Sequence, residues 1–219
     1  MRSLARIAIC LLFLFALTIG AAIAADSLDV PYLSQFWAAT ATLPASQRNG
    51  NCAPAAVEMC AAYAQNRKAT PGNIVELNKL MGRKDPIKGG PTKHQEVCDA
   101  GKKLYKLRIE YKRIGLADAL KEVAAGGPVV VGILYKDIST RWDQNCTSGH
   151  MLVLVGADEK SIIVNDPDDK RPNDKGKNLH YDRAEFEKAM NDFGRRCLVG
   201  FRKQPTPSAP PAPVIEGPG

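Results

Sequence analysis

The stretch GHMLVLVGADEKSIIVNDP, residues 149–167, contains the pattern that decides the fold. Two runs of apolar and β-branched residues, 151–156 and 161–165, are separated by a short polar segment typical of a turn. This pattern predicts two antiparallel strands joined as a hairpin. Because the start of one hairpin strand lies beside the end of the next, we expect His150 and Asp166 to be neighbours. An acidic side chain beside an imidazole fixes the tautomer and the orientation of the ring.

A cysteine stands at the expected start of a helix. Cys52 follows the polar loop 48–51, and apolar residues then recur at helical spacing, which predicts a buried helix over residues 53–65. A thiol at a helix N-terminus lies against the positive end of the helix dipole, where the nucleophilic thiolate is favoured. Position alone leaves three interpretations open: a nucleophile, half of a disulfide, or a small core residue.

Three histidines are candidates for a base that would act on this thiol. His94 lies on a polar helix face and is expected at the surface, and His180 lies in a charged stretch near the end of a loop. His150 begins an apolar strand behind a glycine, where it can face a cleft, although a structural role alone would also fit it. Cys52, His150 and Asp166 follow one another in the order of a papain-type arrangement, with the cysteine on a helix and the other two on a hairpin.

The remaining elements define the fold class. Helices are predicted at residues 71–81, 92–104, 116–125 and 182–192, and further strands at residues 107–112, 128–135 and 197–201. Thr70 is the N-cap candidate of the first of these helices, and Asp182 with Glu185 forms a capping box for the last. The order predicts an α+β fold in which N-terminal helices pack on an antiparallel sheet.

The ends of the chain differ in composition from its middle. Arg2 and Arg6 precede the apolar run 7–19, and small residues follow, as in a signal peptide over residues 1–25; a retained anchor is the alternative. We therefore expect a protein exported to the periplasm or the extracellular space and not held in the membrane after cleavage. A single domain over residues 26–203 and a Pro-rich disordered tail over residues 204–219 complete the predicted organisation.

Composition excludes several classes of protein. Apolar residues make up 45% of the chain and charged residues 24%, as in ordinary globular domains. Without the signal segment 28 basic residues face 23 acidic ones, a net charge of +5 with no basic stripe, so no nucleic-acid partner is expected. Scattered histidines and the absence of a Cys-x-x-Cys motif predict no metal and no cofactor. The four aspartates of one loop read as a solvated acidic segment and not as a calcium site: Asp166, Asp168, Asp169 and Asp174.

Five cysteines remain after removal of the signal segment, an odd number for an oxidising compartment: Cys52, Cys60, Cys98, Cys146 and Cys197. If Cys52 stays free, the favoured disulfides join Cys60 with Cys98 and Cys146 with Cys197. Cys60 also fits the buried helix face as a plain core residue, which leaves that alternative open.

Five short motifs in order carry a resemblance to a known family: VPYLSQ at 30–35, CAPAA at 52–56, GPVVVG at 127–132, Gly149-His150 before an apolar strand, and NDP at 165–167. Together they resemble the bacteriocin-processing, double-glycine leader cysteine peptidases and their secreted papain-like relatives, over residues 28–203. The resemblance implies a papain-like fold, with Cys52 as nucleophile, His150 as general base and acid, Asp166 as orienting residue and a glutamine in the oxyanion hole. Where the family usually has glycine after the cysteine, this chain has Ala53.

Two glutamines compete for the oxyanion position. Gln47 is nearer to Cys52 in sequence, but it lies in a polar stretch with little to fix it. Gln35 follows an extended apolar segment that can dock on the sheet, and its context matches the motif of the family, so it is favoured. The sequence thus predicts an exported thiol hydrolase, a cysteine peptidase that cleaves a peptide or protein substrate through an acyl-enzyme. An amidase or acyltransferase on the same scaffold and a non-catalytic binding module remain alternatives.

Overall fold

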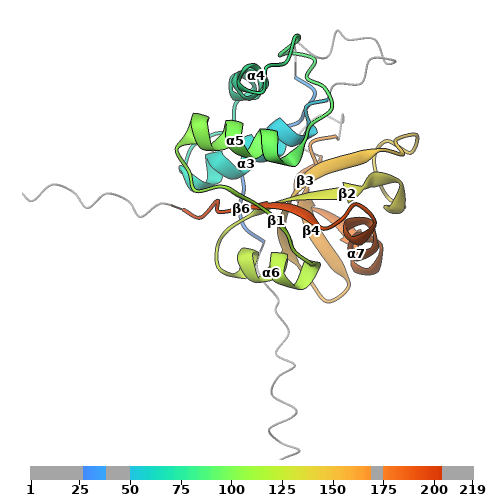
Figure 1. Cartoon of the computed structure of the whole chain (residues 1–219). Helices are drawn as coiled ribbons and strands as arrows, with labels where there is room; N and C mark the ends of the chain where they lie inside the picture. Colours follow the sequence, from blue (N-terminus) through green and yellow to red (C-terminus); the bar gives the residue numbers. More distant parts are fainter. Residues whose placement is uncertain (1–26, 38–49, 169–174, 204–219) are drawn as a thin grey trace, which may run out of the picture.

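A computed structural model describes residues 27–37, 50–168 and 175–203 (Figure 1). The predicted signal peptide, the Pro-rich tail and Gln47 lie outside the described residues. The helices are α3 (Cys52–Ala64), α4 (Pro71–Leu80), α5 (His94–Tyr105), α6 (Leu116–Ala124), the short 3-10 helix η1 (Tyr135–Asp137) and α7 (Arg183–Asp192). The strands are β1 (Glu110–Arg113), β2 (Val129–Leu134), β3 (Gly149–Ala157), β4 (Ser161–Asn165), β5 (Leu179–Asp182) and β6 (Arg196–Val199).

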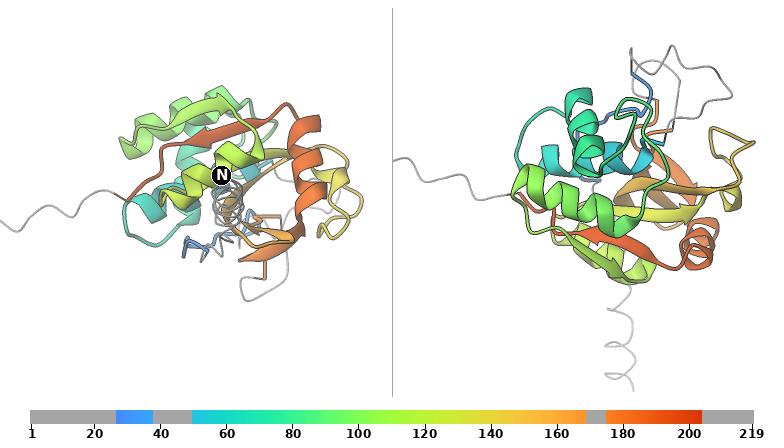
Figure 2. Two further views of the ribbon diagram at one scale, coloured as in Figure 1. Left: turned by 90° about the horizontal axis from the view of Figure 1, so that it is seen from below. Right: turned by 45° about the horizontal axis from the view of Figure 1, so that its top comes forward.

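One antiparallel sheet of six strands organises the domain, in the order β1-β6-β2-β3-β4-β5. Helices α3, α4 and α5 lie on one side of the sheet and α6 and α7 on the other, as can be followed from three directions in Figures 1 and 2. Each side has its own apolar core, one around α3 and α5 and one around α6 and α7. Within the described residues no helix is long and apolar enough to cross a lipid bilayer.

The central hairpin forms as its sequence predicts. Strands β3 and β4 pair in antiparallel register, with Val153 opposite Asn165, and a local irregularity between Leu154 and Gly156 adjusts the register near the turn. The central strands β2 and β3 are buried almost throughout, which explains their continuous apolar sequence. By contrast, β5 (LHYD) is short, polar and partly exposed at the sheet edge, so no periodic signal predicted it.

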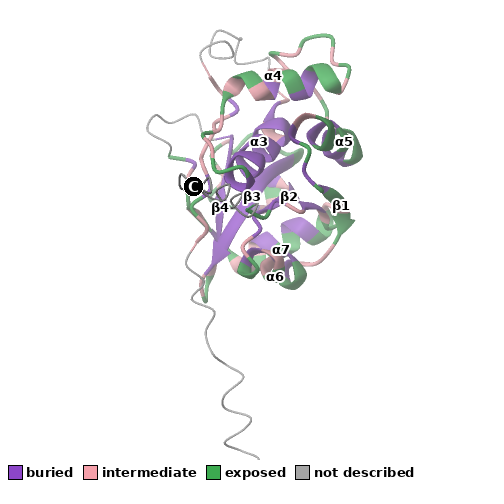
Figure 3. Cartoon of the chain, turned by 90° about the vertical axis from the view of Figure 1, so that its left-hand side faces the viewer, coloured by how far each residue is buried: buried purple, intermediate pink, exposed green. Residues whose placement is uncertain are grey.

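Helix α3 is the most deeply buried helix of the domain, and every residue after Cys52 is buried (Figure 3). Six of the 13 residues of this helix are alanines, which allow it to lie close against β3. Figure 3 shows α3 and the strands β3 and β4 in purple, whereas α4 and α5 carry green on their outer sides. The nucleophile candidate is therefore presented by a helix that the core holds on all sides.

The N-terminal segment 27–37 runs extended along the central hairpin. The Leu28 amide donates to the carbonyl of Val155 at 2.9 Å, and the Asn165 side chain donates to the carbonyl of Val30 at 3.1 Å. The extended conformation that the sequence predicts is thus fixed by bonds to both hairpin strands.

The cap of α7 is only half of a capping box. The Asp182 carboxylate accepts from the amides of Ala184 and Glu185, as predicted. The Glu185 carboxylate instead accepts from the backbone and the hydroxyl of Ser139, at 2.9 Å each. The second half of the box is therefore replaced by a bond that ties α7 to the segment after η1.

A buried carboxylate ties the three helices of the upper layer together. Glu58 on α3 is fully buried and accepts from both terminal nitrogens of Arg67, at 2.7 and 2.9 Å. The Tyr105 hydroxyl at the end of α5 donates to it at 2.8 Å, and the Thr70 amide before α4 donates at 2.8 Å. The Glu58 hydrogen bond raises the pKa of Arg67, so the guanidinium stays charged.

Replacing this carboxylate is expected to destabilise the fold. Glu58→Ala removes the acceptor that Arg67 and Tyr105 share, and we expect the free energy of unfolding to fall by about 3 kcal/mol, because Arg67 can turn to solvent but Tyr105 cannot. The measurement is urea unfolding followed by circular dichroism. Glu76→Ala is the matched control: its ion pair with Lys79 is exposed, and its loss is expected to cost less than about 1 kcal/mol. Equal losses in the two variants would contradict the role of Glu58.

Candidate active site

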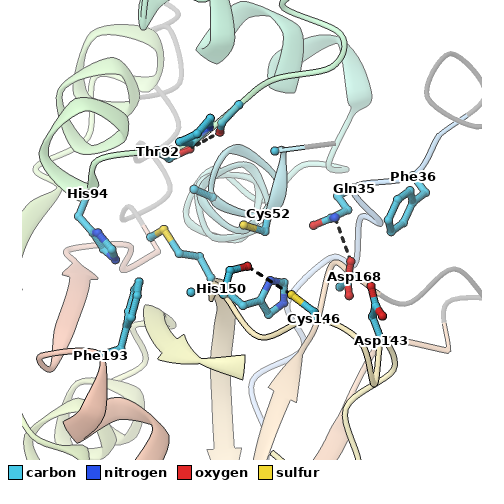
Figure 4. A pocket seen from close by; sticks show the side chains of 17 residues that line it. Gln35, Phe36, Cys52, Thr92, His94, Asp143, Cys146, His150, Asp168 and Phe193 are labelled. Atoms are coloured by element: carbon cyan, nitrogen blue, oxygen red, sulfur yellow. Dashed lines mark hydrogen bonds between the residues drawn. The ribbon is translucent and has the colours of Figure 1, made fainter. Parts of the chain in front are cut away.

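Cys52 opens α3 at the edge of a cavity of about 450 Å³, which Gln35 and His150 also line (Figure 4). It is the one residue of α3 that is only partly buried, whereas the other twelve belong to the interior. The cavity has the size of an ordinary ligand-binding cleft. The partly exposed thiol is thus presented to the cleft from the N-terminus of a buried helix, where the helix dipole favours an anion.

The backbone immediately before the thiol is held by a buried amide network. The Asn51 side chain donates to the carbonyl of Ile87 at 2.7 Å and accepts from the Asn78 side chain at 2.7 Å, and both asparagines are fully buried. Gly89 has a φ of +69°, and a Cβ there would lie 2.3 Å from Oδ1 of Asn51. Only a glycine allows this close approach, which fixes the position of the Cys52 amide.

His150 reaches the cavity from the second residue of β3. Its Nε2 lies 2.7 Å from Oδ1 of Asp166, and the ring lines the same cavity as Cys52. Burial opposes protonation of the ring, but the Asp166 carboxylate and the Cys52 sulfur outweigh it, and the pKa of His150 is raised well above its ordinary value. The bond to Asp166 occupies Nε2 and leaves Nδ1 for the thiol.

The Asp166 carboxylate is fully buried, and four donors serve its two oxygens. Oδ1 accepts from His150 and from the Asp168 amide at 2.9 Å, and Oδ2 accepts from the hydroxyls of Tyr135 at 2.9 Å and Tyr181 at 2.6 Å. Burial raises the pKa of Asp166, but His150 and these donors outweigh it, so the pKa lies below its ordinary value. The group is therefore held as a carboxylate beside the imidazole.

The two tyrosines of this network were not identified from the sequence. Tyr135 begins η1, directly after β2, and its ring also lies against that of His150 with centroids 4.3 Å apart. Tyr181 comes from β5, the edge strand that the sequence pattern did not predict. Burial and the nearby Asp166 charge raise the pKa of both hydroxyls, so both remain donors. The only available signal was a general one, that a buried tyrosine needs a partner for its hydroxyl.

Gln35 is fixed beside the cavity by the loop that follows β4. Its backbone amide donates to the carbonyl of Pro167 at 2.9 Å, and its side-chain nitrogen donates to Oδ1 of Asp168 at 3.0 Å. The preceding segment docks on the same loop, since the Tyr32 hydroxyl donates to the carbonyl of Asp166 at 3.0 Å. The extended segment therefore fixes Gln35, which lies on one side of Cys52 in Figure 4.

Two expectations about polar residues were wrong. His94 is not on the surface: it opens α5, is only 6% exposed and lines the same cavity, because its helix face is covered by the sheet. The loop after β4 is not a solvated acidic segment at its start, because Asp166 and Asp168 are buried by the N-terminal segment and by β5; Asp169 and Asp174 lie outside the described residues. His180 is exposed on β5 and bonds Ser161, as its charged surroundings suggested.

The predicted disulfides are absent, and all five described cysteines are free thiols. Cys60 and Cys98 are packed as apolar residues of the core around α3, and burial raises the pKa of both thiols. Cys197 is buried in β6, whereas Cys146 lines the cavity and contacts the Ser148 hydroxyl at 3.4 Å. The cleft therefore contains a second thiol that sequence reasoning assigned to a disulfide.

The remaining features of the cleft concern Ala53 and metals. Ala53 is fully buried and belongs to the core around α3, although it also borders the cavity. Its methyl group is therefore packed into the core. Among the described residues no group of three or more His, Cys, Asp or Glu side chains is arranged to hold a metal ion.

A model of the Peptidase_C39 like family matches residues 27–198. A C39-like peptidase from Bacillus anthracis has a similar structure, with 18% identity, a TM-score of 0.56, and coverage of 82% of this chain and 100% of that one. The comparison with curated protein sequences gave no match.

Two further solved structures are more distantly similar. A double glycine motif protease from an AMS/PCAT transporter, solved with its leader peptide, has 20% identity and a TM-score of 0.48, and the match covers 82% of this chain and 96% of that one. The peptidase domain of Streptococcus ComA, a bifunctional ABC transporter of a quorum-sensing pathway, has 17% identity, a TM-score of 0.47 and coverage of 70% and 92%. The family match and the Bacillus anthracis structure confirm the papain-like α+β fold that the sequence predicted.

The tyrosine hydroxyls are expected to stabilise the folded protein in acid. Because the pKa of Asp166 is lowered on folding, its contribution to stability is present above its ordinary pKa of 3.8 and is lost as the pH falls through the folded value. Tyr135→Phe or Tyr181→Phe removes one donor to the Asp166 carboxylate and so raises the pKa of Asp166 in the folded protein. The loss of stability in acid then occurs at higher pH, by up to about one pH unit. Acid titration followed by circular dichroism measures the midpoint.

Tyr63→Phe is the control for these variants, because Tyr63 lies on α3 outside the network around Asp166. It should leave the acid midpoint unchanged. If all three variants shifted the midpoint equally, the two hydroxyls would have no special role.

Proposed function

The chain belongs to the Peptidase_C39 like family, and from this we propose that it is an exported cysteine peptidase with Cys52 as its nucleophile. The observation that carries the proposal is the hydrogen bond between His150 and Asp166 together with the position of Cys52 and His150 on the wall of one cavity. Each group comes from an element suited to its role: a helix N-terminus for the thiol, and a rigid hairpin for the base and its orienting carboxylate.

In the first half of the reaction the proton of the Cys52 thiol passes to His150. The sulfur then attacks the carbonyl carbon of the scissile peptide bond and forms a tetrahedral intermediate. The raised pKa of His150 favours the imidazolium, which the Asp166 carboxylate stabilises. The imidazolium gives its proton to the leaving amine, the C–N bond breaks, and the acyl group remains on the sulfur as a thioester.

The second half of the reaction releases the acyl group. His150, now neutral, takes a proton from a water molecule that attacks the thioester carbonyl. When the tetrahedral intermediate collapses, the C–S bond breaks and the proton on His150 returns to the sulfur. The products are a carboxylic acid and the regenerated thiol, so no external oxidant, reductant or metal enters the balance.

The negative oxygen of each tetrahedral intermediate needs donors that are already in place. The backbone amide of Cys52 is one candidate, and its position is fixed by the buried Asn51 network. The side-chain amide of Gln35 is the other. Because this amide carries two N–H groups, the bond to Asp168 orients it and is compatible with donation to the substrate oxygen.

Export follows from the predicted signal peptide over residues 1–25, which precedes the domain. The mature chain would then begin close to the extended segment that docks on the hairpin. In an oxidising compartment the nucleophile must remain a thiol. Burial of Cys60, Cys98 and Cys197 supports this, because these three thiols have no access to Cys52 from within the core.

Labelling and product analysis test the proposal. The full chain is expressed with its signal segment, treated with a peptidyl epoxysuccinate, and examined by mass spectrometry. We expect one label on Cys52 and a mature N-terminus after Ala24 or Ala25. Because Cys146 lines the same cavity, Cys146→Ser serves as the control and should label as the wild type does, whereas Cys52→Ser should not label.

Turnover on a peptide mixture completes the test. His150→Ala is expected to lower turnover at least about 100-fold, while His180→Ala, which alters an exposed residue of β5, should keep full activity. Labelling of Cys52 without peptide hydrolysis, but with transfer to an added amine, would point to an acyltransferase instead. A chain that neither labels nor cleaves would be a binding module, and the proposal would fail.

The two glutamines are expected to differ. Gln35→Ala should lower kcat by about 100- to 1000-fold, because it removes one donor to the oxyanion, while Cys52 should still react with a small alkylating reagent. Gln47→Ala is the matched control and should have little effect on either measurement. If the Gln35 variant had near-normal turnover and the Gln47 variant had strongly reduced turnover, Gln47 and not Gln35 would be the oxyanion donor.

A further inference from the structure

The cleft continues past Cys52, on the side away from Gln35 and Asp168. Figure 4 shows His94 and Phe193 there, across the cleft from the Gln35 side. Met151 also lines the cavity and is paired in register with Gly132, which lies against His94 and Phe193, and Gly149 lies against Phe193. None of these residues has a part in the proposed reaction. The end of the cleft formed by His94, Met151 and Phe193 is called the His94 end below.

The His94 ring is held in one place by aromatic neighbours. Its centroid lies 5.8 Å from that of Tyr111 on β1 and 5.8 Å from that of Phe193 after α7. Arg196 lies over the other ring, with its Cζ 4.8 Å from the Phe193 centroid. Burial, together with the charge of Arg196, lowers the pKa of His94 to about 4, so the ring is uncharged at neutral pH. An uncharged, fixed ring is a suitable wall for an apolar ligand group.

Two glycines make room for these rings on the sheet. A Cβ on Gly132 would lie 2.6 Å from Nε2 of His94, and a Cβ on Gly149 would lie 2.1 Å from Cζ of Phe193. The glycines are on the adjacent strands β2 and β3, close to the position of His150. Side chains at these two positions would push both rings away from the sheet. The shape of the His94 end therefore depends on two backbone positions close to the base.

His94 also has a buried side-chain atom that lacks a hydrogen-bonding partner, as do several other described residues, Asn78 and Arg83 among them. Its side chain is 6% exposed, and Nε2 has no hydrogen-bonding partner among the described residues. A buried polar atom without a partner costs about 1–3 kcal/mol, so the folded chain retains an unfavourable group at the wall of its cleft. This atom lies against Gly132 on the sheet, so it does not by itself indicate a ligand.

We propose that the His94 end is the subsite that accepts a large apolar side chain, aromatic in preference, of the peptide substrate beside the scissile bond. The assignment rests on the proposed function, because it needs a peptide in the cleft. An aromatic side chain would lie against Phe193 and the Met151 thioether, both of which favour aromatic partners. A charged side chain would lose its hydration against an uncharged wall, so it is disfavoured.

Two kinds of measurement test the subsite. The first is the cleavage of a peptide library with all residues varied around the scissile bond. The second is the rate at which two peptidyl epoxysuccinates, identical except for Phe or Ala at the selected position, label Cys52. Labelling needs binding but no hydrolysis, so the ratio of the two rates reports on the subsite even if peptide turnover fails. The wild type should prefer large apolar residues at one position and react with the Phe probe at least about tenfold faster.

Three variants are compared with the wild type. His94→Ala widens the subsite and should raise the rate for Trp relative to Leu by about tenfold, while Cys52 remains reactive. Gly132→Ala pushes His94 and Phe193 into the cleft and should lower the Phe to Ala ratio by about tenfold. Gly72→Ala is the control, since a Cβ at this position on α4 meets nothing within 4 Å, and it should behave as the wild type.

The outcomes separate the two proposals. A higher rate for Trp relative to Leu in the His94→Ala variant, together with a lower Phe to Ala rate ratio in the Gly132→Ala variant, supports the subsite. If Gly132→Ala does not fold, the His94 variant alone decides, because its side chain becomes smaller. Peptide cleavage with the same preference in every variant, or a preference for acidic residues, would overturn the subsite and leave the peptidase standing. Discrimination between the two probes without any hydrolysis would keep the subsite and overturn the peptidase.

Discussion

The buried charge of Asp166 is the constraint around which the site is built. A carboxylate removed from water needs a partner for nearly every lone pair, and here four donors come from β3, β5, η1 and its own loop. To supply them, the edge strand β5 must pair with β4, and η1 must turn the chain at the end of β2. The N-terminal segment closes the remaining side through Tyr32. Most of the sheet is thus required to keep one carboxylate charged.

The same constraint explains why the thiol and the imidazole meet. His150 is held by Asp166 on one side and by the ring of Tyr135 on the other, so its free edge can point in only one direction, toward Cys52. Helix α3 must then begin at that point, and its alanines allow the close packing on β3 that places it there. The nucleophile is positioned by core packing, whereas the base is positioned by hydrogen bonds.

The parts of the structure that the sequence predicted are those with local causes. The hairpin, the buried helix after Cys52 and the docked segment before Gln35 each follow from a periodic pattern or from turn residues next to it in the chain. Contacts between segments distant in the sequence produce no periodic pattern of residues. The tyrosine donors, strand β5 and the Asn51 network depend on such contacts and were therefore not predicted. The disulfide prediction failed because it relied on the expected oxidising compartment and on the number of cysteines, whereas Cys60 is buried as an ordinary apolar residue.

The two histidines of the cleft show why residue type and burial together were not sufficient. His94 and His150 are 6% and 5% exposed, and burial by itself disfavours the charged form of both. Beside the carboxylate of Asp166 the pKa of His150 is raised; beside the guanidinium of Arg196 the pKa of His94 is lowered to about 4. One ring is therefore ready to hold a proton for the thiol, and the other stays neutral as a wall of the cleft. The neighbouring charge, set by the sheet register, assigns these different chemical roles to the same side chain.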